Sequence, residues 1–227
     1  MIRETIRATV RGVGVLLLTA VEVTALSVWL GLVSDAAPIS ADAAVGVVAL
    51  AAGMLIEALL VHVTVNGWGR PVPTRAVAGL ALGGAALWVG WLGAVQWLGG
   101  GLAGVVSAGL GLAVALVVRH TVADNAVRGR RPLATVVQRA TIGLAVLEAA
   151  GATAWLLVVT GVVYLPTWMV ADSVAPVVGF SPSAIVGGAI LACAVFAKHL
   201  LAVRHALRPT QRSNDAGWGS SRGTRPE

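Results

Sequence analysis

Charged residues are scarce in this chain. Only 11% of its 227 residues are Asp, Glu, Lys or Arg, whereas 57% are hydrophobic. A soluble domain of this length carries about a quarter charged residues. The composition therefore excludes an ordinary soluble protein and indicates an integral membrane protein.

Cysteine, phenylalanine and tyrosine are nearly absent as well. The single Cys193 excludes a disulfide within the chain and a cysteine-based metal cluster. Two Phe and one Tyr stand against 28 Gly, so helix packing has to depend on small residues. The chain also lacks an HExxH, a DDxxD, a Gly-x-Ser-Gly and a Walker motif. We therefore expect a protein that is not an enzyme of these classes.

Long apolar runs dominate the rest of the sequence. A membrane-spanning helix needs about 20 mostly apolar residues, and the first run is too long for the apolar core of a signal peptide. The sequence thus predicts an all-α membrane domain over residues 1–209, followed by a disordered, Gly- and Ser-rich tail over 210–227. The six predicted spans are 12–34, 43–66, 76–98, 101–119, 141–164 and 183–203.

The basic residues set the predicted orientation. All 16 Lys and Arg residues fall on one side of this topology, whereas the opposite loops hold Asp35, Asp42 and Asp172. The positive-inside rule then predicts a cell-membrane protein with both termini in the cytoplasm. The basic side faces anionic lipid headgroups, and no basic folded domain remains to bind nucleic acid. On the opposite side, Trp29, Trp97, Tyr164 and Trp168 are expected to form an aromatic belt.

An internal repeat is suggested by two stretches that align. RATIGLAVLEAAGATAWL (139–156) shares several positions with RAVAGLALGGAALWVGWL (75–92), although Ala and Gly are common enough to match by chance. The even-numbered spans share an ending, in which a histidine is followed by an Arg-Pro pair. We predict three tandem two-helix hairpins, related by an axis along the membrane normal. The Arg-Pro pairs are Arg70-Pro71, Arg131-Pro132 and Arg208-Pro209.

Three glutamates interrupt the predicted spans: Glu22, Glu57 and Glu148. At 1.5 Å rise per residue, all three lie roughly 13–17 Å from the basic side, near the bilayer centre. The matching position in the second hairpin is Gly84. No Lys or Arg is expected to reach this layer, so we expect protonated carboxyls unless water or a bound cation enters.

Two interpretations of this carboxyl layer stay open. The functional one is a site that handles protons or cations, because an ionisable residue inside the membrane is costly. The structural one is neutral hydrogen bonding between helices, worth about 1 kcal/mol per bond. Small residues beside the glutamates, such as Gly53 and Gly151, indicate that their faces look towards other helices.

Three histidines are candidate ligands of haem or of a metal whose identity the sequence leaves open. His62, His120 and His199 lie at similar depths, as facing haem ligands would. Arg119 and Lys198 adjoin two of them, however, which favours histidines at the headgroup interface. Glu57 and His62 are five residues apart and do not share a helix face.

The sequence supports three hypotheses about function. The first is a small transporter or channel-like protein that uses Glu22, Glu57 and Glu148 to exchange protons or bind a cation. The second is a scaffold or accessory subunit that binds a membrane-protein partner or a second copy of itself. The third is a haem- or quinone-linked redox subunit that uses the histidines. The apolar outer loop at 165–182 either lies on the membrane or folds back as a lid.

Overall fold

The computed structural model describes residues 2–34, 36–37, 39–67, 69–127, 131, 139–166 and 181–206. Within these ranges it contains α-helices and no strand, which confirms the all-α fold with six membrane helices. The predicted tail, most of the outer loop, Asp35, Trp168 and Asp172 lie outside the described residues. The helices are α1 (Ile2–Val33), α2 (Ala41–Asn66), α3 (Thr74–Trp97), α4 (Leu102–Val127), α5 (Arg139–Val159) and α8 (Pro182–Ala206).

Each helix contains a span long and apolar enough to cross a membrane. The spans are 20 to 26 residues long, with mean hydropathy between 1.6 and 2.4. Large apolar side chains also cover the outside of the bundle, where water would disfavour them and lipid would not. The chain is therefore a multi-pass membrane protein. Examples on the outer surface are Leu16, Val48, Leu82, Leu110, Val114 and Val146.

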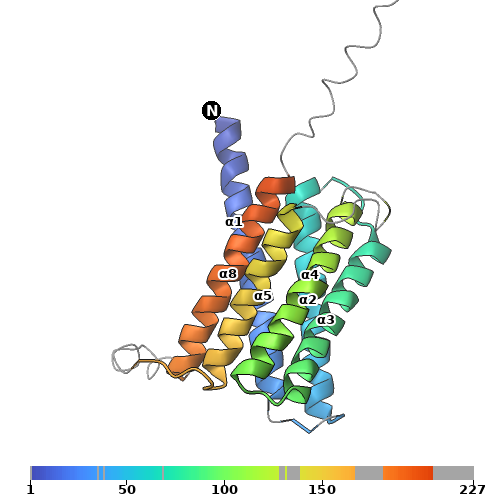
Figure 1. The fold of residues 1–227 in the computed structure, drawn as a ribbon. Coiled ribbons are helices and arrows are strands. Elements are labelled where there is room, and N and C mark those ends of the chain that lie inside the picture. The colour runs from blue at the N-terminus through green and yellow to red at the C-terminus, as the bar shows by residue number, and fades with distance from the viewer. Residues whose placement is uncertain are drawn as a thin grey trace, which may run out of the picture.

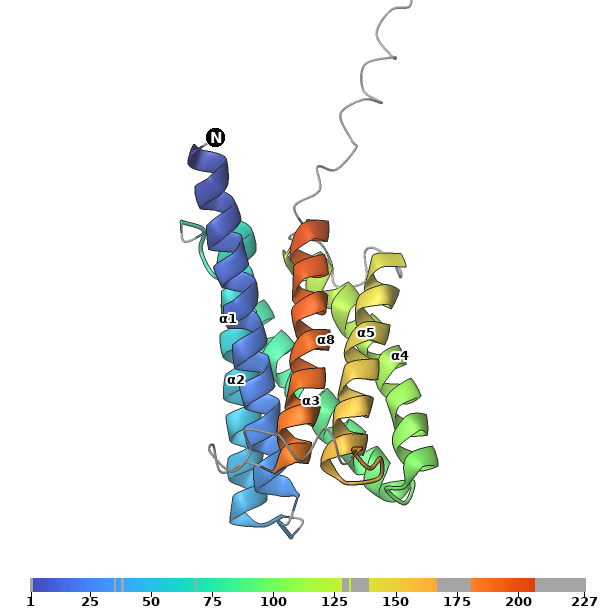
Figure 2. The same cartoon turned by 90° about the vertical axis from the view of Figure 1, so that its left-hand side faces the viewer.

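The six helices form a ring of antiparallel neighbours (Figures 1 and 2). Each helix packs against the next one in the chain, and α8 closes the ring against α1. The first residues of α1, α3 and α5 and the last residues of α2, α4 and α8 lie at one end of the bundle (Figure 1). We call this end the terminal face and the other end the opposite face.

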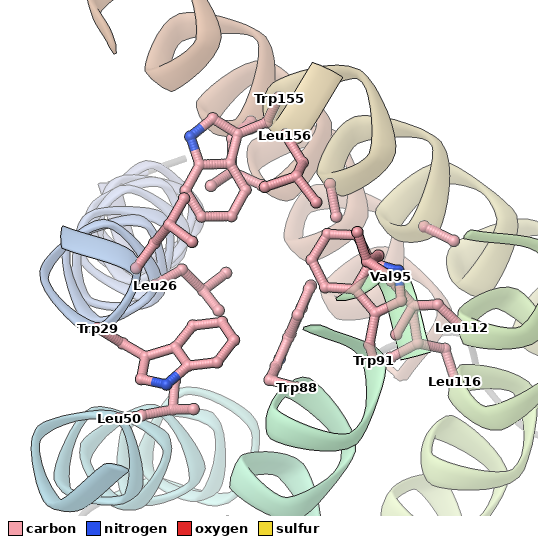
Figure 3. Packing of buried hydrophobic residues seen from close by; sticks show 14 of the residues in the cluster. Leu26, Trp29, Leu50, Trp88, Trp91, Val95, Leu112, Leu116, Trp155 and Leu156 are labelled. Atoms are coloured by element: carbon pink, nitrogen blue, oxygen red, sulfur yellow. The ribbon is translucent and has the colours of Figure 1, made fainter. Parts of the chain in front are cut away.

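Tryptophan and leucine side chains pack together inside the ring (Figure 3). Trp29 and Trp155 lie near the last residues of α1 and α5, towards the opposite face. Trp29, Trp88 and Trp155 are at most 2% exposed. Trp88 packs edge-on against Trp91, with ring centroids 5.5 Å apart and planes at 78°. The predicted belt position of Trp29 is wrong, because this side chain points into the core. We call this group the tryptophan core; it comprises Leu26, Trp29, Leu50, Trp88, Trp91, Leu112, Leu116, Trp155, Leu156 and Leu191.

Glycine allows the helices of two hairpins to approach closely. A Cβ on Gly53 of α2 would overlap Ala25 of α1, and a Cβ on Gly151 of α5 would overlap Ala194 of α8. Ala25 follows Glu22 by three residues, as Gly151 follows Glu148. The first and third predicted hairpins therefore pack alike at the same level. The threefold repeat as a whole stays a prediction.

Candidate functional site

The three glutamates converge inside the ring from α1, α2 and α5. Glu22 and Glu148 are 0% exposed and Glu57 is 6% exposed. Lys198 of α8 joins them, because its Nζ lies 2.5 Å from Glu22 Oε2, 3.4 Å from Glu148 Oε2 and 3.8 Å from Glu57 Oε1. One buried ammonium group thus contacts all three carboxylates.

Arg119 of α4 is the second cation in the cluster. Its NH2 donates a hydrogen bond to Glu57 Oε2 at 3.3 Å, and its NH1 lies 3.6 Å from Glu148 Oε1. The guanidinium also lies against Gly84 of α3, where a Cβ would be 3.2 Å from both Nε and NH2. The absent side chain of Gly84 therefore leaves the space that the guanidinium fills.

These ion pairs correct the prediction that no Lys or Arg reaches the carboxyl layer. That prediction ended the fourth span at Arg119 and placed Lys198 near the end of the sixth span, which it ended at residue 203. The structure extends α4 to Val127 and α8 to Ala206, so each cation lies eight residues before the end of its helix. Eight residues correspond to about 12 Å along a helix axis. Both side chains are thus deep enough to meet the glutamates.

Two of the three candidate histidines contact the same carboxylates. His199 Nε2 lies 2.8 Å from Glu22 Oε2 and forms a hydrogen bond with it. His120 Nε2 lies 2.9 Å from Glu148 Oε2. His62 lies apart, and its ring nitrogens face Arg70 O at 3.5 Å and the Asn66 amide at 3.3 Å. The structure therefore brings His120 and His199 to the glutamates and leaves His62 at the end of α2.

The formal charges of this ionic cluster do not cancel. We define the ionic cluster as Glu22, Glu57, Arg119, His120, Glu148, Lys198 and His199. Three carboxylates face one guanidinium and one ammonium, which leaves one negative charge when both imidazoles are neutral. A net charge in a medium of low dielectric constant is costly. One added proton or monovalent cation would make the cluster neutral.

The cluster also has spare hydrogen-bond acceptors. Glu22 Oε1 and both carboxylate oxygens of Glu148 are buried and have no hydrogen-bond partner among the described residues. The two cations near Glu148, Lys198 and Arg119, lie at 3.4 and 3.6 Å, so they stabilise it mainly through charge. A bound water or ion is one explanation for a buried polar atom without a hydrogen-bond partner. The cluster can therefore accept a further donor or cation.

A cavity of about 170 Å³ connects the cluster to the terminal face. Glu57, Arg119 and Lys198 lie at its inner end, and Pro73 and His205 lie near the helix ends. Its walls between these ends are mostly apolar. Pockets that hold drug-sized ligands are larger, about 300–1,000 Å³, so this cavity suits water, ions and small solutes. The four histidines that line it are all the histidines of the chain: His62, His120, His199 and His205.

A subset of the cluster has the arrangement of metal ligands. One atom each from Glu22, Glu57 and His199 lies within 4.8 Å of the other two, and all three residues are buried. Carboxylate oxygen and imidazole nitrogen are ligands of Zn²⁺, Mn²⁺ and Fe²⁺. Among the described residues, these three side chains form a group of His, Cys, Asp or Glu side chains that lie close enough together to bind one metal ion.

Arg119 and Lys198 are the site residues that sequence reasoning missed. A signal was present, because Arg119-His120 and Lys198-His199 repeat a basic residue followed by histidine on two even-numbered spans. Models of known protein families, curated proteins and solved structures were compared with this chain, and none matches it. The candidate function therefore has to be argued from the site itself.

Proposed function

We propose that this chain is a small membrane transporter or channel-like protein that moves a proton or a small cation through the ionic cluster. The observation that carries the proposal is a buried cluster with an unbalanced negative charge at the inner end of a cavity. A purely structural ion pair has no need of an access path, whereas an exchangeable ion requires one. We further propose that the protein lies in the cell membrane with its terminal face in the cytoplasm.

The charge balance supports an exchangeable positive charge. The pairs Glu22–His199 and Glu148–His120 each place an imidazole nitrogen within 2.9 Å of a carboxylate oxygen. One additional proton in the cluster would make it neutral. A proton or small cation arriving through the cavity would compete for the same negative charge.

The tryptophan core supports access from one face at a time. Trp29 follows Glu22 by seven residues on α1, and Leu191 precedes Lys198 by seven residues on α8. Seven residues correspond to about 10 Å, so the core separates the cluster from the opposite face. A cycle of transport would require the helices that carry this core to move apart, after the cluster has received its cation.

The test is an ion-flux assay in liposomes that enclose a pH-sensitive dye. We expect the wild-type protein to move protons when a gradient of pH, Na⁺ or K⁺ is imposed. The variants Glu22→Gln, Glu57→Gln and Glu148→Gln should lose this flux while eluting as folded protein. Asp42→Asn is the matched control, because Asp42 is an exposed carboxyl in the first turn of α2. Wild-type flux in all three glutamine variants would overturn the proposal.

A second candidate function is a membrane scaffold held together by the same charges. The observation that favours it is the Glu57–Arg119 pair, which joins α2 to α4 across α3. Such a link stabilises the ring whether or not anything is transported. This candidate predicts no flux from the wild-type protein, unfolding of the glutamine variants, and a membrane-protein partner or second copy retained in mild detergent.

A further inference from the structure

We propose that the ionic cluster is a binding site for a divalent transition-metal cation, with Glu22, Glu57 and His199 as ligands. This inference rests on the proposed function, since it names the class of cation that the transporter would carry. The three ligand atoms come from α1, α2 and α8 and already lie within 4.8 Å of one another. Oxygen and nitrogen ligands bind Zn²⁺ at about 2.0–2.2 Å in a tetrahedral arrangement, so two ligand atoms of one ion are about 3.3–3.6 Å apart. The three ligand atoms therefore have to approach one another by up to about 1.5 Å to form the site.

The buried carboxylate of Glu148, which has ion-pair contacts but lacks a hydrogen-bond partner among the described residues, is a second observation that points to a cation. Glu148 is 0% exposed, and neither of its oxygens has a hydrogen-bond partner among the described residues. Its Oε2 lies 3.4 Å from Lys198 Nζ, which also contacts Glu22 and Glu57. An ion near the position of this ammonium would therefore face a third carboxylate.

Lys198 is the competitor for this site. Its Nζ contacts the Glu22 and Glu57 carboxylates that would bind the metal, so ammonium and metal exclude each other. Lys198 also lines the cavity, so binding of a metal would require its flexible side chain to turn into this cavity. The same cavity reaches Glu57 and His199 and provides the entry path.

The charge count favours a divalent over a monovalent ion. Once the Lys198 ammonium has left, three carboxylates and the Arg119 guanidinium carry a net charge of two negative units. One divalent cation makes this sum zero, whereas a monovalent cation leaves one negative charge buried. The imidazole of His199 further favours transition metals over Mg²⁺ and Ca²⁺, which prefer oxygen ligands only.

The test is titration of detergent-purified, metal-stripped protein with Co²⁺, whose visible absorption reports bound nitrogen and oxygen ligands. We expect one Co²⁺ per chain, displaced by Zn²⁺. His199→Gln and Glu22→Gln should weaken binding by about 100-fold, and Lys198→Met should tighten it by about tenfold, in the range known for changes around metal sites. Cys193→Ser and Asp42→Asn remove metal-binding side chains outside the cluster and should bind like wild type.

A second measurement guards against variants that fail to fold. Zn²⁺ should raise the melting temperature of the wild-type protein, because a ligand that binds only the folded state stabilises it. The shift should vanish in His199→Gln and persist in Asp42→Asn. Co²⁺ binding that survives in both the His199→Gln and the Glu22→Gln variant would overturn the assignment. Absence of Co²⁺ binding in both the wild-type protein and the Lys198→Met variant would overturn it as well.

These results separate the metal site from the proposed function. Proton or monovalent-cation flux that depends on the glutamates, without Co²⁺ binding, would refute the metal and leave the transporter. Co²⁺ binding that depends on Glu22 and His199, without flux of any ion including Mn²⁺ or Zn²⁺, would support the metal site and refute transport.

Discussion

Removal of the Lys198 ammonium tests whether the ionic cluster is balanced by charge. At an effective dielectric constant of 20, contacts at 2.5, 3.4 and 3.8 Å are each worth roughly 4–7 kcal/mol before desolvation. Desolvation of the ammonium offsets much of this, and loss of one partner of a buried pair costs about 3–5 kcal/mol. We therefore expect Lys198→Met to lower the melting temperature by on the order of 10 °C, because three carboxylates would face Arg119 alone.

A double variant identifies the cause of this loss. Lys198→Met with Glu22→Gln restores the wild-type formal charge, so it should be more stable than Lys198→Met by roughly 1–3 kcal/mol. Thermal unfolding in detergent, followed by tryptophan fluorescence, gives the melting temperatures of the wild-type protein, the Lys198→Met variant and the double variant. Arg204→Met is the control, because Arg204 is an exposed cation in the last turn of α8; its effect should be about 0.5 kcal/mol or less. A double variant that melts no higher than Lys198→Met would refute the charge argument.

Two further predictions concern glycines that set the packing around the cluster. Gly53→Ala should destabilise the fold by roughly 1–3 kcal/mol, because the added methyl group overlaps Ala25. Adding Ala25→Gly in the same chain should restore the melting temperature. Gly79→Ala is the control, because a Cβ at Gly79 meets nothing within 4 Å. Gly84→Leu should displace the Arg119 guanidinium from Glu57, abolish ion flux and lower the melting temperature, and unchanged flux would contradict the role given to Arg119.

The helices and the depth of the glutamates follow from local physics. An apolar run of more than 20 residues has few alternatives to a membrane helix, because lipid cannot satisfy exposed backbone groups. The rise per residue is constant, so counting from the basic side placed Glu22, Glu57 and Glu148 at one level. The structure shows the same three carboxylates around a single ammonium.

The ion-pair partners of the glutamates could not be predicted from local sequence patterns. The stretch after Arg119 is more polar than the rest of α4, which suggested a helix end at the membrane surface. Thr121 and Asn125 are nevertheless buried, because neighbouring helices pack over them and α4 continues to Val127. Such burial depends on which helices are neighbours in the ring. The contact between α8 and α1 that brings Lys198 to Glu22 joins residues 176 positions apart.

The order of the helices in the ring explains why position 84 is a glycine. Apart from His120 and His199, each helix contributes one residue to the layer: Glu22, Glu57, Gly84, Arg119, Glu148 and Lys198, in the order in which the helices surround the ring. Lys198 is on α8, which packs between α5 and α1, and each of these two helices carries a glutamate of the cluster. The Lys198 side chain therefore reaches these glutamates without passing another helix. Neither helix that packs against α2 places a cation in this layer, because α1 carries Glu22 and α3 carries Gly84. A glycine on α3 lets the Arg119 side chain extend past that helix and reach Glu57 at 3.3 Å. The position that breaks the predicted pattern of glutamates is thus the one that allows the second cation to join them.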